Sequence, residues 1–430
     1  MSTSDHDAPI GLVGATAIGI GGMVGGGIFA VLGVAARYAG GATPVAFMIA
    51  GAVAAVTGYS YTKLSVHYPS PGGTVTFIDR AFGVSDITGT VNVVLWAGYI
   101  ATTALYASAF ANYAGALATS GSTIDPVVVR LLIAVGIGAP MLINMATASL
   151  VSKSEGIIVG IKLTILMIVI AAGMPSVDAV SLAPSSWPSP LGIIGAGMLI
   201  FVAYEGFELI SNASTEITRP RRNLPRAYGL SIAIVIVLYV AIAVVVVGTL
   251  TPAQIEQAAD YALAEAASET LGQAGFTLVG VGAVLATLSA INATLYGAAR
   301  LAFTVASQGE LPHRLTHQVW NQPAGLYITA GTSAAIAITL PLANIASLAS
   351  AIFLIVFAVV NTAAFRCGSE AAVRRPLAII GTIGCSGALI VLIIDSIANN
   401  PTAMVALVFL LAAVLTAEHA FLKHRRIRSV

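Results

Sequence analysis

Charged residues stand inside stretches of the chain that are otherwise apolar enough to lie in a membrane, and they are the first candidates for chemistry. Lys162 lies in an apolar run that follows Glu155. A lysine at membrane depth costs about 2.5–3.5 kcal/mol and is functional by default. Because burial disfavours the charged form of an amine, Lys162 could take up and release a proton. The alternative is that its side chain snorkels to the cytoplasmic face.

Two acids lie in a second apolar run, Ile200–Ile210. Glu208 could be a protonatable gate or a partner for cationic substrates, and Glu205 stands shortly before it. Either acid could instead be a buried, protonated group that is hydrogen-bonded to a neighbouring helix. We favour a function for both, because Gly206 between them indicates that the helix is interrupted there.

Glycine dominates the first hydrophobic segment. Six of the eleven residues in Gly19–Phe29 are glycine. Glycine costs about 1 kcal/mol per position relative to alanine in a helix interior, so the cluster is an odd way to build a simple span. One explanation is close packing of transmembrane helices. The other is a helix interrupted at mid-membrane, whose freed backbone groups face a polar ligand.

The two unusual runs together predict a binding site for a zwitterion. In the first run, N–H groups at the start of a half-helix near Gly27 could receive a carboxylate. In the second, freed carbonyl groups could accept hydrogen bonds from an ammonium group. An anion site beside a cation site fits an α-amino acid. The predicted substrate-binding residues are Met23, Gly25, Gly26, Gly27, Phe201, Val202, Ala203, Tyr204, Glu205 and Gly206.

Polar side chains on two further apolar runs could complete the pocket. Tyr99, Thr103 and Tyr106 follow helical spacing and could form its wall, with Glu208 as a gate, although an aromatic packing stripe fits the spacing equally well. Ser289 shares a helix face with Asn292. These two side chains could hydrogen-bond Lys162 or hold a cation, or they could simply join neighbouring helices.

The composition indicates which kind of protein positions these residues. Of 430 residues, 57% are hydrophobic and 9% are charged, against about 25% charged in soluble domains. We therefore predict an all-α integral membrane protein with a single transport domain over 1–430. The net charge of +1 is uninformative about nucleic acid, and no nucleic-acid partner is expected. Cys367 and Cys385 suggest no disulfide or metal site, and no cofactor is expected.

Hydropathy predicts twelve transmembrane helices, each of which needs roughly 20 apolar residues. They lie at about 11–36, 43–62, 87–118, 126–148, 155–175, 191–213, 226–250, 272–306, 325–341, 345–365, 376–396 and 402–422. Lysine and arginine indicate the orientation. With the N-terminus inside, sixteen of the 19 basic residues lie in inner loops or in the C-terminal tail. Both termini are therefore predicted to be cytoplasmic.

The first and sixth predicted spans contain the two unusual runs. They occupy corresponding positions if helices 1–5 (10–175) and helices 6–10 (190–365) form two repeats, followed by helices 11 and 12 (376–422). Interrupted spans at matching places in two halves are the best sequence indication of a transporter binding site. The repeat is inferred from hydropathy and from the two interruptions, because no strong residue similarity joins the halves.

Several motifs resemble those of the amino acid–polyamine–organocation permease superfamily, and the resemblance covers nearly the whole chain. They are the glycine-rich first span ending in Gly27-Ile-Phe29, the run Phe207-Glu208 followed by Glu216, Arg219-Pro220 and Asn223-Leu-Pro-Arg226, and Pro71-Gly-Gly73 with Ala81-Phe-Gly83. Other stretches are similar to an archaeal proton-coupled, broad-specificity amino acid transporter of that superfamily. These are Tyr59–Leu64, Asn292–Gly297, Gly309–Pro312 and Gly325–Thr329.

The resemblance implies the five-plus-five inverted-repeat fold of the leucine transporter, with discontinuous helices 1 and 6 and two extra C-terminal helices. It also implies that substrate lies between the two discontinuous helices and that transport proceeds by alternating access. In the archaeal relative a lysine on the fifth helix takes the place of a coupling sodium ion, and Lys162 matches it, with Ser289 opposite. The chain departs from the family at Gly26, where many members have serine. It also departs at Glu205, an acid that the archaeal relative lacks.

These expectations describe a secondary transporter that moves amino acids across the cytoplasmic membrane by proton symport. Lys162 and Ser289 are the predicted proton-coupling residues. The alternatives are an amino acid or amine exchanger, a sodium-coupled carrier and a substrate-gated sensor. An enzyme is not expected, because no buried histidine pairs with an acid. The identity of the substrate and the oligomeric state are left open.

Overall fold

The computed structural model of the chain describes residues 10–412, except 84, 120, 122, 123, 147, 308–310, 312, 321, 369, 400, 410 and 411. Nearly all of the described chain is helical. Both predicted cytoplasmic termini lie outside the described residues. So do most of the predicted twelfth span, of which 401–409 is described as helix, and most of the motif Gly309–Pro312.

The α-helices follow one another along the chain and differ widely in length. They are α1 (Leu12–Met23), α2 (Gly27–Ala39), α3 (Thr43–His67), α4 (Thr74–Phe82), α5 (Asp86–Thr119), α6 (Pro126–Ala146), α7 (Ala148–Gly173), α8 (Pro190–Leu199), α9 (Leu209–Asn212), α10 (Pro220–Thr249), α11 (Pro252–Gln257), α12 (Ala262–Ser307), α13 (Ala324–Thr339), α14 (Leu342–Arg366) and α15 (Arg375–Asn399). Short 3₁₀ turns are η1 (Gly40–Ala42), η2 (Met174–Ser176), η3 (Pro184–Ser186), η4 (Phe201–Tyr204), η5 (Ala259–Tyr261) and η6 (His313–Thr316). A two-stranded antiparallel hairpin, β1 (Gln318–Val319) and β2 (Gln322–Pro323), precedes α13.

Helices lie over each of the first eleven predicted spans. By length and composition, eight helical stretches of the described chain could cross a membrane. The pair Pro190–Leu199 and Phe201–Asn212, bent by 50°, raises that number to as many as nine. The helices α1 and α13 are apolar but shorter. The chain is therefore a multi-pass helical membrane protein, while the total of twelve spans and the repeat stay predictions.

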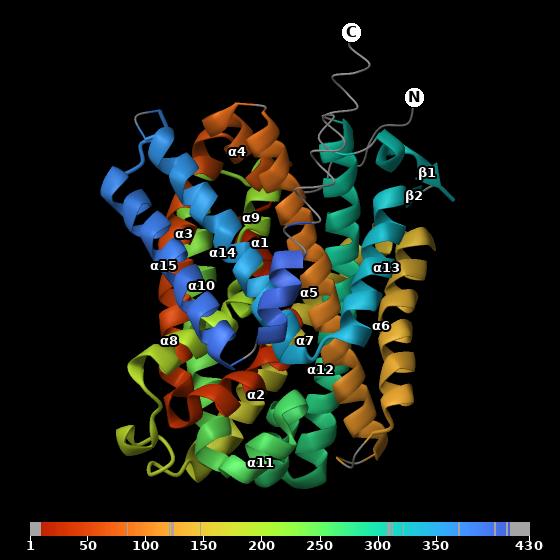
Figure 1. Ribbon diagram of the computed structural model, residues 1–430, viewed down its shortest axis with the longest axis vertical. Coiled ribbons are helices and arrows are strands. Elements are labelled where there is room, and N and C mark those ends of the chain that lie inside the picture. Colours follow the sequence, from red (N-terminus) through yellow and green to blue (C-terminus); the bar gives the residue numbers. More distant parts are fainter. Residues whose placement is uncertain are drawn as a thin grey trace.

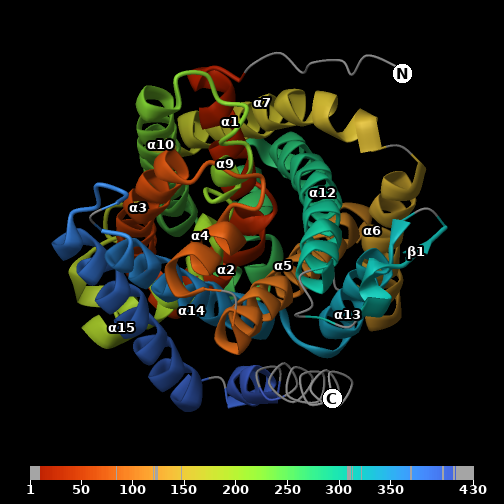
Figure 2. The same cartoon turned by 90° about the horizontal axis from the view of Figure 1, so that it is seen from above.

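The interrupted helices lie in the interior of the molecule. Seen from above, α2 and α9 lie near the middle, α1 runs inward from the rim between α10 and α7, and α6, α13 and α15 lie at the periphery (Figure 2). The interior helices are held by long neighbours, because α1 packs on α10, α10 on α3, and α12 on α5. The helix α4 lies at one end of the molecule and α11 at the other (Figure 1). These two ends are called the α4 end and the α11 end below.

The peripheral helices present apolar side chains outward. On α15, Ile383, Ile390 and Ile397 are all exposed and recur every seven residues along one face. A soluble protein rarely exposes such a continuous apolar surface. In a membrane this surface contacts lipid tails, which are as apolar as the side chains. The outward face of α15 therefore agrees with the membrane location that the composition predicts.

Both unusual runs of the sequence are interrupted helices in the structure. The first span stops being helical after Met23, where α1 ends, and becomes helical again at Gly27, where α2 begins. The sixth span passes from α8 through the 3₁₀ turn η4 into an extended residue, Glu205, and Gly206, and then into the short helix α9. The interruptions predicted from glycine density and from the position of the acids thus lie where they were expected.

Two glycines allow the interruptions to cross. A Cβ atom added to Gly22 would lie 2.5 Å from the carbonyl oxygen of Gly206, and one added to Gly206 would collide with the backbone of Gly22. The φ angle of Gly206 is +118°, a conformation that other residues rarely adopt. The two backbones therefore approach at a distance that no side chain permits.

We expect Gly206→Ala to destabilise the protein by roughly 2 kcal/mol or more, because it adds backbone strain to overpacking. The measurement is the thermal unfolding midpoint of the purified protein in detergent. Gly229→Ala on α10 is the matched control, since a Cβ atom there would meet nothing within 4 Å. Equal midpoints for the two variants would contradict the crossing described here.

Candidate functional site

A cavity of about 520 Å³ lies beside the crossing of the two interrupted helices. Six of the predicted site residues line it, and they come from five separate segments of the chain: Gly25, Tyr99, Lys162, Glu205, Gly206 and Ser289. Gly21, Gly22 and Tyr106 line it as well. Residues from α1, α5, α7, the sixth span and α12 are therefore brought together around one space, although they are far apart in the sequence.

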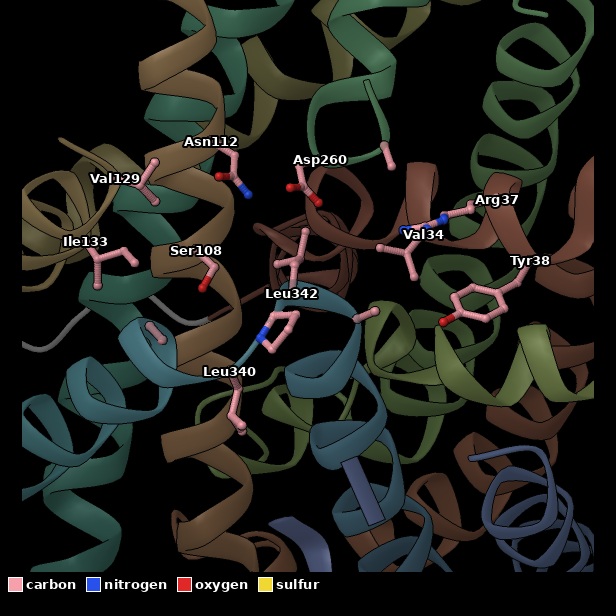
Figure 3. A pocket seen from close by; sticks show the side chains of 14 residues that line it. Val34, Arg37, Tyr38, Ser108, Asn112, Val129, Ile133, Asp260, Leu340 and Leu342 are labelled. Atoms are coloured by element: carbon pink, nitrogen blue, oxygen red, sulfur yellow. The ribbon is translucent and has the colours of Figure 1, made fainter. Parts of the chain in front are cut away.

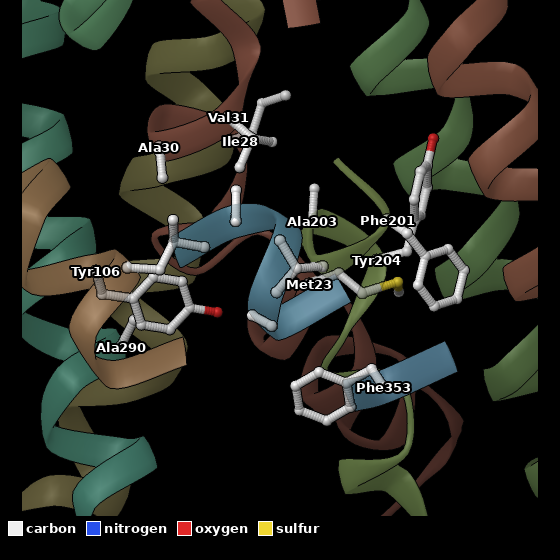
Figure 4. Packing of buried hydrophobic residues seen from close by; sticks show 14 of the residues in the cluster. Met23, Ile28, Ala30, Val31, Tyr106, Phe201, Ala203, Tyr204, Ala290 and Phe353 are labelled. Atoms are coloured by element: carbon white, nitrogen blue, oxygen red, sulfur yellow. The ribbon is translucent and has the colours of Figure 1, made fainter. Parts of the chain in front are cut away.

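The other predicted site residues do not line this cavity. Met23, Gly26, Gly27, Thr103, Phe201, Val202, Ala203, Tyr204 and Glu208 are all buried and pack behind its wall. Figure 4 shows several of them in the apolar interior, with Met23 near Ala203 and with the Tyr106 hydroxyl pointing toward the space between the helices. The hydroxyl of Thr103 donates to the carbonyl of Tyr99 on its own helix, at 2.8 Å.

A tyrosine on α10 joins the two interruptions. The hydroxyl of Tyr239 lies 2.6 Å from the carbonyl oxygen of Met23 and 3.2 Å from that of Ala203, and both are hydrogen-bonded contacts. Met23 ends α1, so its carbonyl has no partner within that helix. Tyr239 therefore satisfies one freed carbonyl at each interruption. Sequence reasoning missed this residue, whose only signal is a lone polar group in a very apolar helix.

A serine on α14 restores hydrogen bonds that the sixth span loses. The N–H of Val202 donates to the hydroxyl oxygen of Ser350 at 2.9 Å, and the Ser350 hydroxyl donates to the carbonyl of Leu199 at 2.7 Å. Ser350 is fully buried. It acts as an external cap on α8, and it was also missed from the sequence because serine is common in transmembrane packing.

The two acids of the sixth span have different surroundings. Glu208 accepts a hydrogen bond from the N–H of Gly206 at 2.8 Å, so it stabilises the turn in which it lies. Glu205 lines the cavity, where the hydroxyl of Tyr106 donates to its Oε2 atom at 3.4 Å. Glu205 is 5% exposed, and the Glu208 carboxyl lies close enough to interact with it. The acid that faces the cavity is thus Glu205.

Lys162 is a buried lysine on the wall of the same cavity. Its exposed fraction is 3%, so in this structure its side chain does not extend to the surface. Ser289 lines the cavity from α12. Asn292, one turn further along α12, accepts a hydrogen bond from the Asn144 side chain on α6 at 2.7 Å. That contact joins two helices, which is one of the roles considered for the Ser289–Asn292 face.

The cavity extends from buried residues to the α4 end of the molecule. Its inner wall includes Lys162 and Glu205, and its outer wall includes the exposed residues Glu216, Arg300 and Thr304. The loop from Pro71 to Thr74, which leads into α4, borders the same opening. A ligand could therefore reach the crossing of the interrupted helices from the α4 end.

The α11 end holds a separate, smaller cavity of about 290 Å³ (Figure 3). Ser108, Asn112 and Asp260 lie around it, and Arg37 on α2 lines it while forming an ion pair with Glu256 on α11 at 2.6 Å. Between the two cavities, nearly the whole of α2 is buried. Phe29 on α2 packs edge-on against Tyr113 on α5, with ring centroids 6.0 Å apart. The path toward the α11 end is closed by this packing.

The described residues contain no group of three or more histidine, cysteine, aspartate or glutamate side chains that could hold a metal ion. What the cavity offers instead is a buried amine, a buried carboxyl, hydroxyl groups and glycine backbone. Groups of this kind can bind a small charged ligand and exchange protons. They do not form a nucleophile–base arrangement of the kind that hydrolases use.

A multi-pass helical protein with a cavity at the meeting point of two interrupted spans has the architecture of a membrane transporter. Sequence comparison gives the family. The chain matches the amino acid permease family over residues 10–417, and it belongs to that family. Its relatives place it among transport proteins and not among enzymes.

Three relatives illustrate the range of that family. The chain is 35% identical to the inner membrane transport protein YbaT of Escherichia coli, over 89% of this chain and 90% of that protein. It is 34% identical to an uncharacterized protein of Methanocaldococcus jannaschii, over 88% and 87% of the two chains. It is 29% identical to the chloroplastic cationic amino acid transporter 7 of Arabidopsis thaliana, over 66% of this chain and 52% of that one.

We expect Gly25→Leu to abolish ligand binding, because the new side chain would fill the cavity beside the crossing. A Cβ atom on Gly25 would lie 3.3 Å from the Ala290 Cβ atom, so the rest of a leucine side chain must occupy the cavity. Binding of labelled amino acids to the purified protein, by scintillation proximity, is the measurement. Gly331→Leu on α13 is the control, since a side chain there meets open space. Normal affinity in Gly25→Leu would place the ligand elsewhere.

Proposed function

We propose that the protein carries amino acids across the cytoplasmic membrane by proton symport, with Lys162 as the proton-coupling residue. The observation that carries the proposal is the location of Lys162. A buried lysine lines the same cavity as the glycines and the acid at the crossing of the interrupted helices. A proton site and a substrate site that share one cavity can influence each other directly, which symport requires.

The amino acid as substrate is supported by the family and by the start of α2. Because α2 begins at Gly27, its first-turn N–H groups have no partners within that helix, and the positive end of the helix dipole favours a carboxylate there. The names of the permease family and of the Arabidopsis cationic amino acid transporter both include the words amino acid. The substrate in this proposal is therefore an α-amino acid whose carboxylate lies near Gly25–Gly27.

The transport cycle in this proposal is alternating access. With the N-terminus inside, the α4 end is cytoplasmic, and the cavity that contains Lys162 opens inward while α2 and η5 close the outer side. A five-plus-five repeat with two further C-terminal helices is part of the same proposal. Reopening toward the α11 end would require α2 to separate from η5, against which it packs in this structure.

Exchange of internal for external amino acid is the second candidate function. It differs from symport in its dependence on a proton gradient, which can be measured. An exchanger moves substrate in both directions without such a gradient. In an exchanger Lys162 would have a structural role, for example holding α7 against α12, which pack together.

We expect wild-type protein in proteoliposomes to concentrate labelled amino acids only when an inward proton gradient is present. Lys162→Ala should bind the same amino acids but fail to concentrate them, a loss of at least tenfold in accumulation. The measurement is uptake of a twenty-amino-acid panel with and without the gradient, together with counterflow from preloaded vesicles. If wild type ignores the gradient but exchanges internal for external substrate in counterflow, the protein is an exchanger and Lys162 has a structural role.

A further inference from the structure

We propose that the carboxylate of Glu205, and not a backbone carbonyl of the sixth span, receives the α-ammonium group of the substrate. This inference rests on the proposed amino acid transport and specifies how the positive charge of the substrate is recognised. It makes Glu205 a binding residue that fixes the chemical class of ligand, a compound with a protonated amine.

The residues whose carbonyl groups the sequence offered for this role do not line the cavity. The lining residues from the sixth span begin at Glu205, and the stretch Phe201–Tyr204 packs behind the wall. Several carbonyls in this region already accept hydrogen bonds. The Ile200 carbonyl accepts from the N–H of Ala203 at 2.9 Å, and the Val202 carbonyl accepts from the N–H of Glu205 at 3.1 Å.

Backbone carbonyls where the first interruption meets the sixth span also accept hydrogen bonds already. The carbonyls of Met23 and Ala203 are hydrogen-bonded to Tyr239, whose side chain is fully buried and does not line the cavity. The Ile20 carbonyl accepts from the N–H of Val24 at 2.7 Å. An ammonium group needs several acceptors in a dry site, since an unsatisfied buried charge is very costly. The carbonyls of Met23, Ala203 and Ile20 thus already have donors.

Glu205 is arranged to supply an acceptor. It adjoins Gly206, whose backbone touches Gly22, so its side chain starts beside the first interruption. Tyr106 donates to one of its oxygens and thereby orients the carboxyl group, while a carboxylate has acceptor sites to spare for an ammonium. The Glu208 carboxyl lies close enough to interact with Glu205. A charge-assisted hydrogen bond is roughly twice as strong as a neutral one.

The order of the groups along the backbone suits an α-amino acid. Gly25 lines the cavity, and the N–H groups at the start of α2 follow directly after it. The carboxylate and the ammonium of an α-amino acid are separated by one carbon atom. A ligand whose carboxylate lies near Gly25 therefore has its ammonium close to Gly22 and Gly206, which is where the Glu205 side chain begins.

The test compares each amino acid with an analogue that lacks one positively charged group, the α-ammonium in the first two pairs below and the side-chain guanidinium in the third. The probes are alanine with lactate, leucine with 2-hydroxy-4-methylpentanoate, and arginine with citrulline. Affinities are measured for purified wild type, for Glu205→Gln, which preserves size, and for Glu205→Asp, which preserves charge. Glu269→Gln is the matched control, because it removes an exposed acid on α12 that does not line this cavity.

We expect wild type to bind alanine and leucine at least tenfold more tightly than their hydroxy acids. In Glu205→Gln the affinity for both amino acids should fall at least tenfold, while the hydroxy acids bind as before or better. Glu205→Asp should recover part of the loss, and Glu269→Gln should leave the ratios unchanged. The arginine-to-citrulline ratio should be similar in wild type and Glu205→Gln, because the α-ammonium is common to both.

Three results would overturn the inference. In one, Glu205→Gln retains wild-type affinity for alanine and leucine. In the second, only the arginine-to-citrulline ratio collapses, which would assign Glu205 to the substrate side chain. In the third, affinity is unchanged but gradient-driven accumulation is lost, which would assign Glu205 to proton coupling. Each of these leaves proton-driven amino acid uptake by wild type intact, so the proposed transport function is judged separately from this inference.

Discussion

The close approach of Gly22 and Gly206 is the constraint on which the centre of this protein depends. Each residue occupies the space where the other would carry a side chain, so the two interrupted helices cross backbone to backbone. The glycine cluster weakens a helix by about 1 kcal/mol per residue. Gly25 and Gly26 avoid that cost because they lie in the interruption, whereas Gly19, Gly21 and Gly22 lie in α1 and Gly27 begins α2.

An interruption inside an apolar interior exposes backbone groups that lipid cannot satisfy. In this protein the missing hydrogen bonds are supplied from other helices, by Tyr239 on α10 and by Ser350 on α14, and from within the turn by Glu208. The interrupted helices are therefore stable only when α10 and α14 are already packed against them. Their shape is a property of the assembled bundle and not of their own sequence.

This dependence explains what the sequence could and could not predict. Glycine density in Gly19–Phe29 and acids in an apolar run are local signals, and they located both interruptions. Tyr239 and Ser350 act through tertiary contacts, and nothing local distinguishes them from ordinary packing residues. The direction of the turn at Phe201–Tyr204 also depends on Ser350 and Tyr239. Its carbonyls were expected to face the ligand, whereas that stretch packs behind the cavity wall and Glu205 faces the cavity.

The helix α2 gives the binding site a mechanical connection to the closed side of the molecule. Its N-terminus follows Gly25 at the 520 Å³ cavity, and Arg37, near its C-terminus, lines the smaller cavity at the α11 end. Its 13 residues form a rod about 20 Å long. The exposed Arg37–Glu256 ion pair contributes little to closure, since surface pairs are worth about 0–1 kcal/mol. The buried face of α2 does most of the sealing. A ligand that displaces the N-terminus of α2 would therefore also displace the packing that closes the α11 end, because α2 is a single rigid element. Alternating access needs a coupling of this kind.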